Sequence, residues 1–179
     1  MRRFVSLVLF VLLALPALAE AQSRPQTREG FWIGFGLGGG SFGCDECGDE
    51  DRLTGAAAYF KLGGTVNQNV LLGAEINGWA KSEDGATLSL SNVNAVIYLY
   101  PSKTGGFHFK GGIGLATVRF EIGDVEADET GGGAVLGIGY DARVGKNFSL
   151  TPFLNVTAGR FDNGYKANTV QVGLGASWH

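Results

Sequence analysis

Residues 31–40 read FWIGFGLGGG, and this stretch decides the fold because large apolar residues alternate in it with small ones. Phe31, Ile33, Phe35 and Leu37 share one parity, and glycine holds most of the other. A period of two is typical of a β-strand whose two faces differ, because successive side chains point to opposite sides of a strand. We therefore predict a strand with one face of large apolar side chains and one face of small side chains.

The alternation recurs in seven further runs, at residues 56–63, 72–79, 92–99, 107–115, 134–143, 150–158 and 170–178. Helix signals are scarce, because glycine and β-branched or aromatic residues recur every few positions. No run beyond the N-terminus approaches the ~18 apolar residues of a membrane-spanning helix. Eight strands of roughly 10 residues are typical of an all-β, eight-stranded, antiparallel up-and-down transmembrane β-barrel.

A soluble barrel is the alternative to a membrane barrel. A soluble barrel would carry charged side chains on the outward face of most strands. Here the non-apolar face is mostly Gly, Ser, Thr and Asn, and its charged members are Lys61, Glu75, Lys110, Asp141 and Arg143. Such a face suits a narrow lumen better than a solvated surface, so we expect the apolar face to meet lipid.

The composition narrows the function classes. The chain has 179 residues, 30 of them glycine, and a net charge of -3. Hydrophobic residues make up 45%, too many for a disordered chain. The weak negative charge argues against a nucleic-acid partner, which favours a basic face. We expect many of the glycines to line the inside of the barrel, where absent side chains let a narrow barrel close.

The first 21 residues have the features of a cleaved secretory signal peptide. Arg2 and Arg3 precede an apolar run that ends at Leu15, and small residues follow. We expect cleavage after Ala21, with a cut after Ala19 as the alternative; the run is shorter than the ~20 residues of an uncleaved membrane anchor. The predicted organisation is a signal peptide (1–21), a short N-terminal periplasmic segment (22–29) and an outer-membrane β-barrel domain (30–179).

The links between the predicted strands alternate in length and chemistry. Residues 65–69, 101–106 and 145–147 are short, whereas 39–52, 81–86, 121–130 and 161–168 are longer and hold 13 of the 17 acidic residues. Outer-membrane barrels have short periplasmic turns and longer outer loops, so we expect acidic loops outside the cell and both termini in the periplasm. Two interpretations of the acidic loops stay open. They form a solvated surface, or they bind divalent cations, which prefer carboxylate oxygens and could bridge to lipopolysaccharide phosphates.

Cys44 and Cys47 form a CxxC motif. Neighbouring carboxylates would disfavour a reactive thiolate, and one pair supplies too few ligands for a structural zinc site. In an exported protein we expect a disulfide between them, with metal binding as the alternative. Because the loop it closes is short, this disulfide should contribute little to folding.

Four stretches carry a resemblance to a known family: the glycine-rich stretch 31–40, NVNAVIYLYP at 92–101, KGGIGL at 110–115 and the alternating last strand. Over about residues 30–179 the chain resembles the OmpA-like or OmpX-like small outer-membrane β-barrels. The resemblance implies a lumen plugged by salt bridges, for which the candidates are Lys61, Glu75, Lys110, Asp141 and Arg143. We also expect a C-terminal assembly signal, with the candidate residues Val172, Leu174, Ala176 and Trp178, although His179 rather than an aromatic residue ends the chain.

Aromatic residues are expected in two places. Tyr100, Phe107, Phe148 and Trp178 should form an interfacial belt at the periplasmic boundary. The inward parity also holds large rings, which should fill space opposite glycine: Tyr59, Trp79, Tyr98 and Phe153.

Catalysis finds little support. Residues 34–39 match G-x-G-x-x-G, but an acidic stretch follows instead of a helix, so the match indicates no nucleotide site. Among related barrels, lipid A deacylases resemble one another in a His-x-Ser pair, which His108-Phe109-Lys110 does not match. We predict no catalytic residues, no metal ligands and no cofactor.

Barrels of this family serve as anchors, adhesins, small pores and enzymes, so the fold does not decide the role. We predict a monomeric barrel with a structural or surface-interaction role through its acidic loops. The alternatives are a small gated pore and, with less support, a lipid-modifying enzyme. The expected partners are outer-membrane lipid and lipopolysaccharide, the outer-membrane assembly machinery and, on the second interpretation of the loops, divalent cations.

Overall fold

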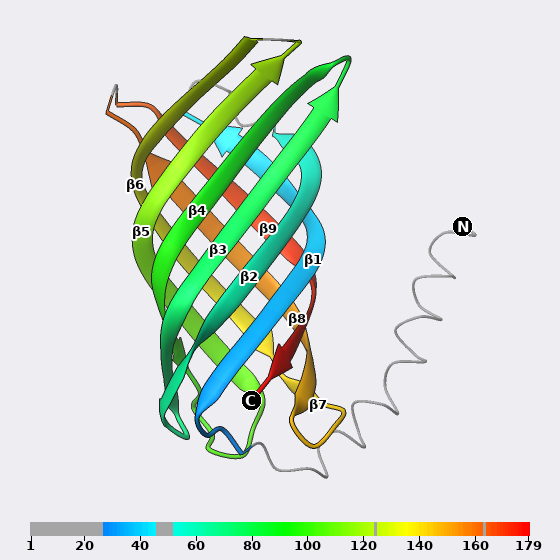
Figure 1. Cartoon of the computed structure of the whole chain (residues 1–179), viewed down its shortest axis with the longest axis vertical. Helices are drawn as coiled ribbons and strands as arrows, with labels where there is room; N and C mark the ends of the chain where they lie inside the picture. Colours follow the sequence, from blue (N-terminus) through cyan, green and yellow to red (C-terminus); the bar gives the residue numbers. More distant parts are fainter. Residues whose placement is uncertain (1–26, 46–51, 124, 163) are drawn as a thin grey trace, which may run out of the picture.

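The structure is a computed structural model and describes residues 27–45, 52–123, 125–162 and 164–179. Its strands are β1 (Phe31–Cys44), β2 (Leu53–Asn67), β3 (Val70–Glu83), β4 (Ala86–Leu99), β5 (Phe107–Ile122), β6 (Val125–Tyr140), β7 (Ala142–Arg143), β8 (Phe148–Arg160) and β9 (Lys166–Trp178). They pair antiparallel around one barrel (Figure 1). The predicted signal peptide lies outside the described residues.

The barrel closes because β1 pairs with both β2 and β9, and β8 pairs with both β9 and β6. The two-residue β7 follows β6 after a break at Asp141, whose backbone N–H donates to the carbonyl of Gly106 (2.9 Å). Since β6 and β7 both pair with β8, they form one interrupted strand of the wall. The predicted eight-stranded antiparallel barrel is confirmed, although the predicted run 134–143 is broken near its end.

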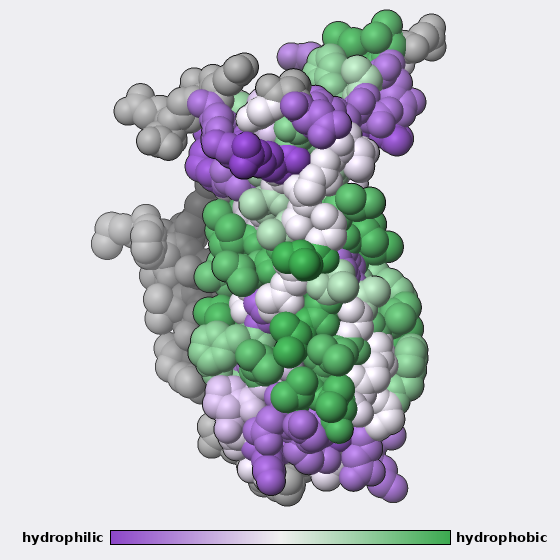
Figure 2. Space-filling model, turned by 90° about the vertical axis from the view of Figure 1, so that its left-hand side faces the viewer, coloured by the Kyte–Doolittle hydropathy of each residue, from purple (hydrophilic) through white to green (hydrophobic). Residues whose placement is uncertain are grey.

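The face of large apolar residues points outward, as predicted. Ile113 is 75% exposed and Leu136 67%, whereas the inward-facing Tyr98 is 2% exposed. On the face that Figure 2 shows, hydrophobic residues extend across the middle of the barrel, and hydrophilic residues gather toward both ends. A soluble monomer rarely exposes so large an apolar area, whereas a transmembrane barrel needs such a band against lipid. Among the residues that the structure describes, no helix is long and apolar enough to cross a membrane.

The two ends of the barrel differ in shape. One end, named the terminal end here, holds residue 27, His179 and the turns β2–β3 and β4–β5. At the opposite end the hairpins β3–β4 and β5–β6 rise above the other strands (Figure 1), and this end is named the protruding end.

The predicted long links at 81–86 and 121–130 are wrong. Strand pairing continues to Glu83 opposite Ala86, and to Ile122 opposite Val125. Between β3 and β4, Asp84 and Gly85 both have positive φ (50° and 81°), as a tight two-residue hairpin turn requires. The charge of these stretches indicated loops, but strand pairing continues on both sides of each turn, and Asp84-Gly85 forms the turn between β3 and β4. Most of the described acidic residues in the two stretches therefore lie on paired strands.

The aromatic belt at the terminal end is present in part. The Trp178 ring lies 4.8 Å from the Phe148 ring, and Phe107 is an exposed neighbour of Phe109, with ring centroids 5.0 Å apart. Tyr100 does not belong to the belt, because its side chain points into the barrel and is 2% exposed. Its hydroxyl finds a buried acceptor there, as described below.

Candidate functional site

A hydrogen-bonded ion pair lies inside the barrel. The Glu75 carboxylate is fully buried and accepts hydrogen bonds from the Lys110 ammonium, the Tyr98 hydroxyl and Asn77 Nδ2 (2.8 Å). Adjacent strands bring these groups together, because Tyr98 of β4 is directly opposite Lys110 of β5. Three donors compensate the buried carboxylate, which would be costly if it stood alone.

Lys61 lies next to this pair but among aromatic rings. Its Nζ is 4.7 Å from the centre of the Tyr98 ring and 5.7 Å from that of Tyr59. In the register of β2 and β3, Lys61 is opposite Glu75. Ring faces attract an ammonium group, so the aromatic side chains inside the barrel both fill space and stabilise charge. The structure thus brings Lys61, Glu75 and Lys110 together.

Asp141 forms a second buried cluster. Its carboxylate accepts hydrogen bonds from the hydroxyls of Tyr100 (2.7 Å) and Thr151 (2.6 Å), and His108 Nδ1 lies 3.9 Å away. Asp141 is 1% exposed. The break between β6 and β7 occurs at this residue, and the cluster occupies the lumen where β4, β5 and β8 surround it.

Arg28 lies among the turns of the terminal end, a position that was not predicted from the sequence. Arg28 is fully buried, and its guanidinium lies 3.5 Å from the centre of the Tyr100 ring. It donates to the carbonyls of Gln68 (3.1 Å), Lys103 (3.3 Å) and Gly105. The segment before β1 is therefore tied to the β2–β3 and β4–β5 turns. A single arginine before a strand carried no signal of this role.

Arg143 also binds backbone at the terminal end. Its guanidinium donates to the carbonyls of Lys146 (2.9 Å) and Thr27 (3.1 Å). The side chain is buried, at 3% exposure. Arg143 therefore fastens the β7–β8 turn to the N-terminal segment, a role that the predicted lumen network did not include.

Apolar side chains fill the lumen toward the protruding end, where the prediction of a small or polar inner face was incomplete. The rings of Trp79 and Phe42 stack with centroids 5.0 Å apart, and Trp79 Nε1 donates to the carbonyl of Gly40 (3.0 Å). The buried members of this upper cluster are Phe42, Ala57, Trp79, Leu90, Ala116, Phe161 and Ala167. A period of two separates the faces of a strand, but it does not show that one face changes from polar to apolar along its length.

The protruding end carries charges of both signs. Arg119 of β5 lies 3.1 Å from Glu126 and 3.8 Å from Glu121. Lys81 lies 2.6 Å from Glu83, and its hydrogen bond and charge lower the pKa of that exposed carboxyl. The described part of this end is therefore a surface of mixed charge with ion pairs. The predicted loop acids Glu46, Asp49, Glu50, Asp51 and Asp124 lie outside the described residues.

The inner face of the protruding hairpins exposes apolar side chains beside the Lys81–Glu83 ion pair. Phe120 and Ile122 share the parity of the inward-facing Lys110 and are 45% and 48% exposed. Val125 lies opposite Ile122 and is 65% exposed. A hollow of about 310 Å³ opens on this face, lined by Leu53, Lys81, Glu83, Asp84, Ala86, Leu88 and Phe120. Because residues 81–86 and 121–130 were predicted as loops, this surface was not predicted from the sequence.

The predicted metal and disulfide sites are only partly described. Within residues 27–45, 52–123, 125–162 and 164–179, no group of three or more His, Cys, Asp or Glu side chains could hold a metal ion. Cys44 ends β1 and has no free thiol. Cys47 lies outside the described residues, so the pairing of the two cysteines stays a prediction.

The predicted C-terminal assembly signal lies on β9. Val172, Leu174 and Trp178 are 62%, 54% and 39% exposed on the outer wall, whereas Ala176 is covered, at 9%. The Trp178 ring lies 5.9 Å from that of Phe35 on β1, where the barrel closes. Recognition of this C-terminal signal by the outer-membrane assembly machinery stays a prediction.

A closed barrel with a lipid-facing apolar band and a largely polar lumen is the architecture of bacterial outer-membrane β-barrel proteins. The family model described as outer membrane protein beta-barrel domain matches residues 5–177, so the chain belongs to this family. The resemblance to OmpA-like and OmpX-like barrels is thereby confirmed, and the family is one of the outer membrane.

Two solved structures share this architecture at low sequence identity. Neisserial surface protein A has a TM-score of 0.67 and 13% identity, with 86% of this chain and 99% of that chain covered. Ail, the attachment invasion locus protein of Yersinia pestis, in complex with the heparin analogue sucrose octasulfate, has a TM-score of 0.59 and 14% identity, with 84% and 99% covered. Such identities show the fold alone. No curated protein matches the chain.

Proposed function

We propose that the protein is a monomeric surface-interaction protein of the outer membrane, with the protruding hairpins as its binding surface and a lumen that does not conduct. The exposed apolar inner face of these hairpins carries the proposal. β5 has 16 residues, whereas roughly 9–11 tilted residues span a bilayer. The excess would hold Phe120 and Ile122 beyond the lipid, and an apolar face exposed to water marks an interaction site.

The protruding end faces outside the cell in this proposal, and both termini lie in the periplasm. Barrels of this class have short periplasmic turns and longer extracellular elements, and the β3–β4 and β5–β6 hairpins project beyond the other strands at the protruding end (Figure 1). The outer wall of the protruding end then meets lipopolysaccharide. Ail, named for attachment and invasion, is a precedent for a surface role on the same fold.

A closed lumen is supported by side chains at three depths. Arg28 lies at the terminal end, the Glu75–Lys110 pair lies deeper inside, and Trp79 stacks on Phe42 toward the protruding end. An eight-stranded barrel is only just wide enough for side chains. In planar bilayers we expect no conductance steps from the wild type, and steps from wild type would favour the gated pore instead.

An enzymatic role finds no support at His108. His108 is 3% exposed, and its ring lies 5.4 Å and 5.0 Å from the rings of Tyr98 and Tyr100 inside the barrel. A lipid at the outer wall could not reach a base in that position. We therefore propose a binding role and no reaction.

The binding surface is tested by cell adhesion. The double variant Phe120→Ser/Ile122→Ser removes apolar area from the inner face, and Arg119→Gln/Glu126→Gln on the outer face of the same hairpin is the matched control. Heat-modifiable gel migration verifies folding of both. Cells carrying the first variant should adhere less to protein-coated and epithelial surfaces, while cells with the control adhere as wild type. Equal adhesion of all three would refute this surface as the binding site.

A further inference from the structure

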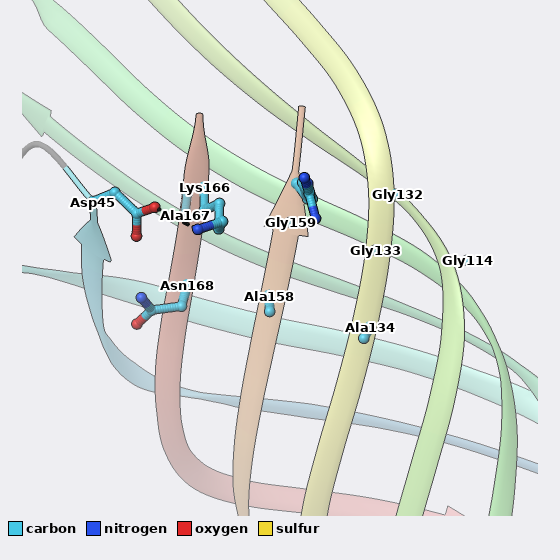
Figure 3. Close-up of a pocket in the computed structure, with 11 residues that line it drawn as sticks. Asp45, Gly114, Gly132, Gly133, Ala134, Ala158, Gly159, Lys166, Ala167 and Asn168 are labelled. Carbon is cyan, nitrogen blue, oxygen red and sulfur yellow. Dashed lines mark hydrogen bonds and ion pairs between the residues drawn. The ribbon is translucent and has the colours of Figure 1, made fainter. Parts of the chain in front are cut away.

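A hollow on the outer wall stands apart from the lumen and from the protruding hairpins. The wall around it is built of large apolar residues, but Gly132, Ala134 and Ala158 are small and adjacent, because Ala134 of β6 is opposite Ala158 of β8. They line a hollow of about 440 Å³. Figure 3 shows Gly132 and Ala134 on one strand, Ala158 on the next, and Lys166 and Asn168 on the strand after it.

Cationic residues lie at one end of this hollow. Arg160 and Lys166 line it and are opposite each other at the end of the β8–β9 hairpin. The Asp45 carboxylate also lines the hollow and lies 3.0 Å from Lys166 Nζ (Figure 3). Arg160 has no ion-pair partner within the part of the chain that the structure describes. Among the described residues, the hollow therefore has an apolar floor and, at its rim, one cationic side chain without an ion-pair partner.

The β8–β9 hairpin shows how deep the hollow lies in the membrane. At the terminal end, Phe148 is opposite Trp178, and this aromatic pair is typical of the membrane interface. Arg160 and Lys166 are opposite each other 12 residues further along the same two strands. Because roughly 9–11 residues cross the hydrocarbon core, the cations lie at the level of the other headgroup layer. The small residues lie just inside the acyl region.

We propose that this hollow binds one phosphate-bearing lipid of the outer leaflet, of the lipid A class that anchors lipopolysaccharide. An acyl chain lies over Gly132, Ala134 and Ala158, and Arg160 and Lys166 bind the headgroup phosphate. Guanidinium groups form short, charge-assisted and often bidentate hydrogen bonds with phosphate, so the charge at the rim selects an anionic headgroup. The proposal deepens the proposed function and rests on it, because the protruding end must face outside for lipid A to reach the hollow.

One substitution should strengthen lipid binding instead of weakening it. The Asp45 carboxylate forms an ion pair with Lys166 and repels an approaching phosphate, so Asp45→Asn should raise the affinity for the lipid. The double variant Arg160→Gln/Lys166→Gln, named the charge variant, removes both cations and should weaken lipid binding. Ala158→Leu keeps the charges and fills the floor with a side chain that is common on the lipid-facing wall.

The experiment is native mass spectrometry of the folded barrel in detergent, titrated with bisphosphorylated lipid A. The charge variant and Ala158→Leu should each weaken binding about tenfold or more. Arg160→Lys should retain most of the affinity, and Lys103→Gln, which removes an exposed cation at the terminal end, should bind as wild type. The wild type should bind dephosphorylated lipid A as weakly as the charge variant binds intact lipid A. Gel migration before and after boiling verifies that each variant is folded.

Two outcomes would overturn the lipid site. One is equal lipid A affinity for wild type, the charge variant and Ala158→Leu. The other is binding of inorganic phosphate alone as tightly as lipid A, which would indicate a simple anion site.

Orientation is tested separately by an epitope inserted between Asp84 and Gly85 and probed with antibody on intact cells. An inaccessible epitope there would contradict the proposed orientation, while the detergent titration would still decide the lipid site.

Discussion

The substitution Lys110→Met tests the buried ion pair most directly. It leaves the fully buried Glu75 carboxylate with the Tyr98 hydroxyl and Asn77 Nδ2 as its remaining donors. Breaking a buried ion pair by removing one partner costs about 3–5 kcal/mol. Because two donors persist and the Lys61 ammonium lies next to the Tyr98 ring, we expect the lower limit, about 3 kcal/mol. This corresponds to a folding equilibrium constant lower by roughly 150-fold.

The double variant Glu75→Gln/Lys110→Met separates the pair from the packing around it. Removing both charges leaves no unpaired ion, so we expect a loss of about 1 kcal/mol or less relative to the wild type. The coupling energy of the pair is the stability loss of the double variant minus the summed losses of the two single variants, Glu75→Gln and Lys110→Met. Lys103→Met, at an exposed position in the β4–β5 turn, is the control and should stay within about 0.5 kcal/mol.

The assay is urea unfolding of the barrel in lipid vesicles, followed by tryptophan fluorescence and by gel migration. Equal slopes of free energy against urea would show that the variants unfold between comparable states. Two results would refute the reasoning: a loss below about 1 kcal/mol for Lys110→Met, or a double variant as unstable as that single variant.

Three further predictions use the same assay. Arg28→Ala removes hydrogen bonds to three backbone carbonyls and should lower the free energy of unfolding by about 2–3 kcal/mol, and an unchanged midpoint would contradict the role of the N-terminal segment. Trp79→Ala should cost about 3–5 kcal/mol, because it leaves a cavity in the upper cluster of the lumen, and a loss near zero would show that this region is not packed. Gly85→Ala places an L residue at φ of +81° and should cost about 1–2 kcal/mol, whereas Gly78→Ala, whose added Cβ meets nothing within 4 Å, should be nearly neutral.

The sequence predicted the fold and the two faces of its strands because period-two alternation reports directly on which side chains share an environment. Phe35 and Glu75 illustrate this, since one is 48% exposed on the outer wall and the other is fully buried inside. The number of runs then predicted the number of strands. Lys61, Glu75 and Lys110 could be assigned to the lumen for the same reason, although their pairing depends on strand register, which alternation does not report.

The parts that the sequence did not predict depend on contacts between distant segments. Tyr100 follows β4 at a turn, where an aromatic residue suits the membrane interface. Its side chain points into the barrel instead, because its hydroxyl donates to the buried Asp141 carboxylate and its ring packs against the Arg28 guanidinium. The length of the β5–β6 hairpin was missed because acidic residues suggested a loop. Glu121 and Glu126 are opposite each other there, and Arg119 pairs with both carboxylates, so the strands can pair despite the two facing acids.

Small residues act in the same way on both faces of the barrel wall. Inside, Gly63 lies opposite Gly73, and a Cβ added to either residue would lie 2.6 or 2.7 Å from Cζ2 of the Trp32 ring. The indole packs in the lumen because these two positions lack side chains, so the inward glycines determine which large side chains can close the barrel. Outside, Ala134 and Ala158 interrupt a wall of large residues and leave a hollow of about 440 Å³. Missing side-chain volume therefore makes room for large side chains on the inner face, and on the outer face it leaves the space in which the proposed acyl chain would pack.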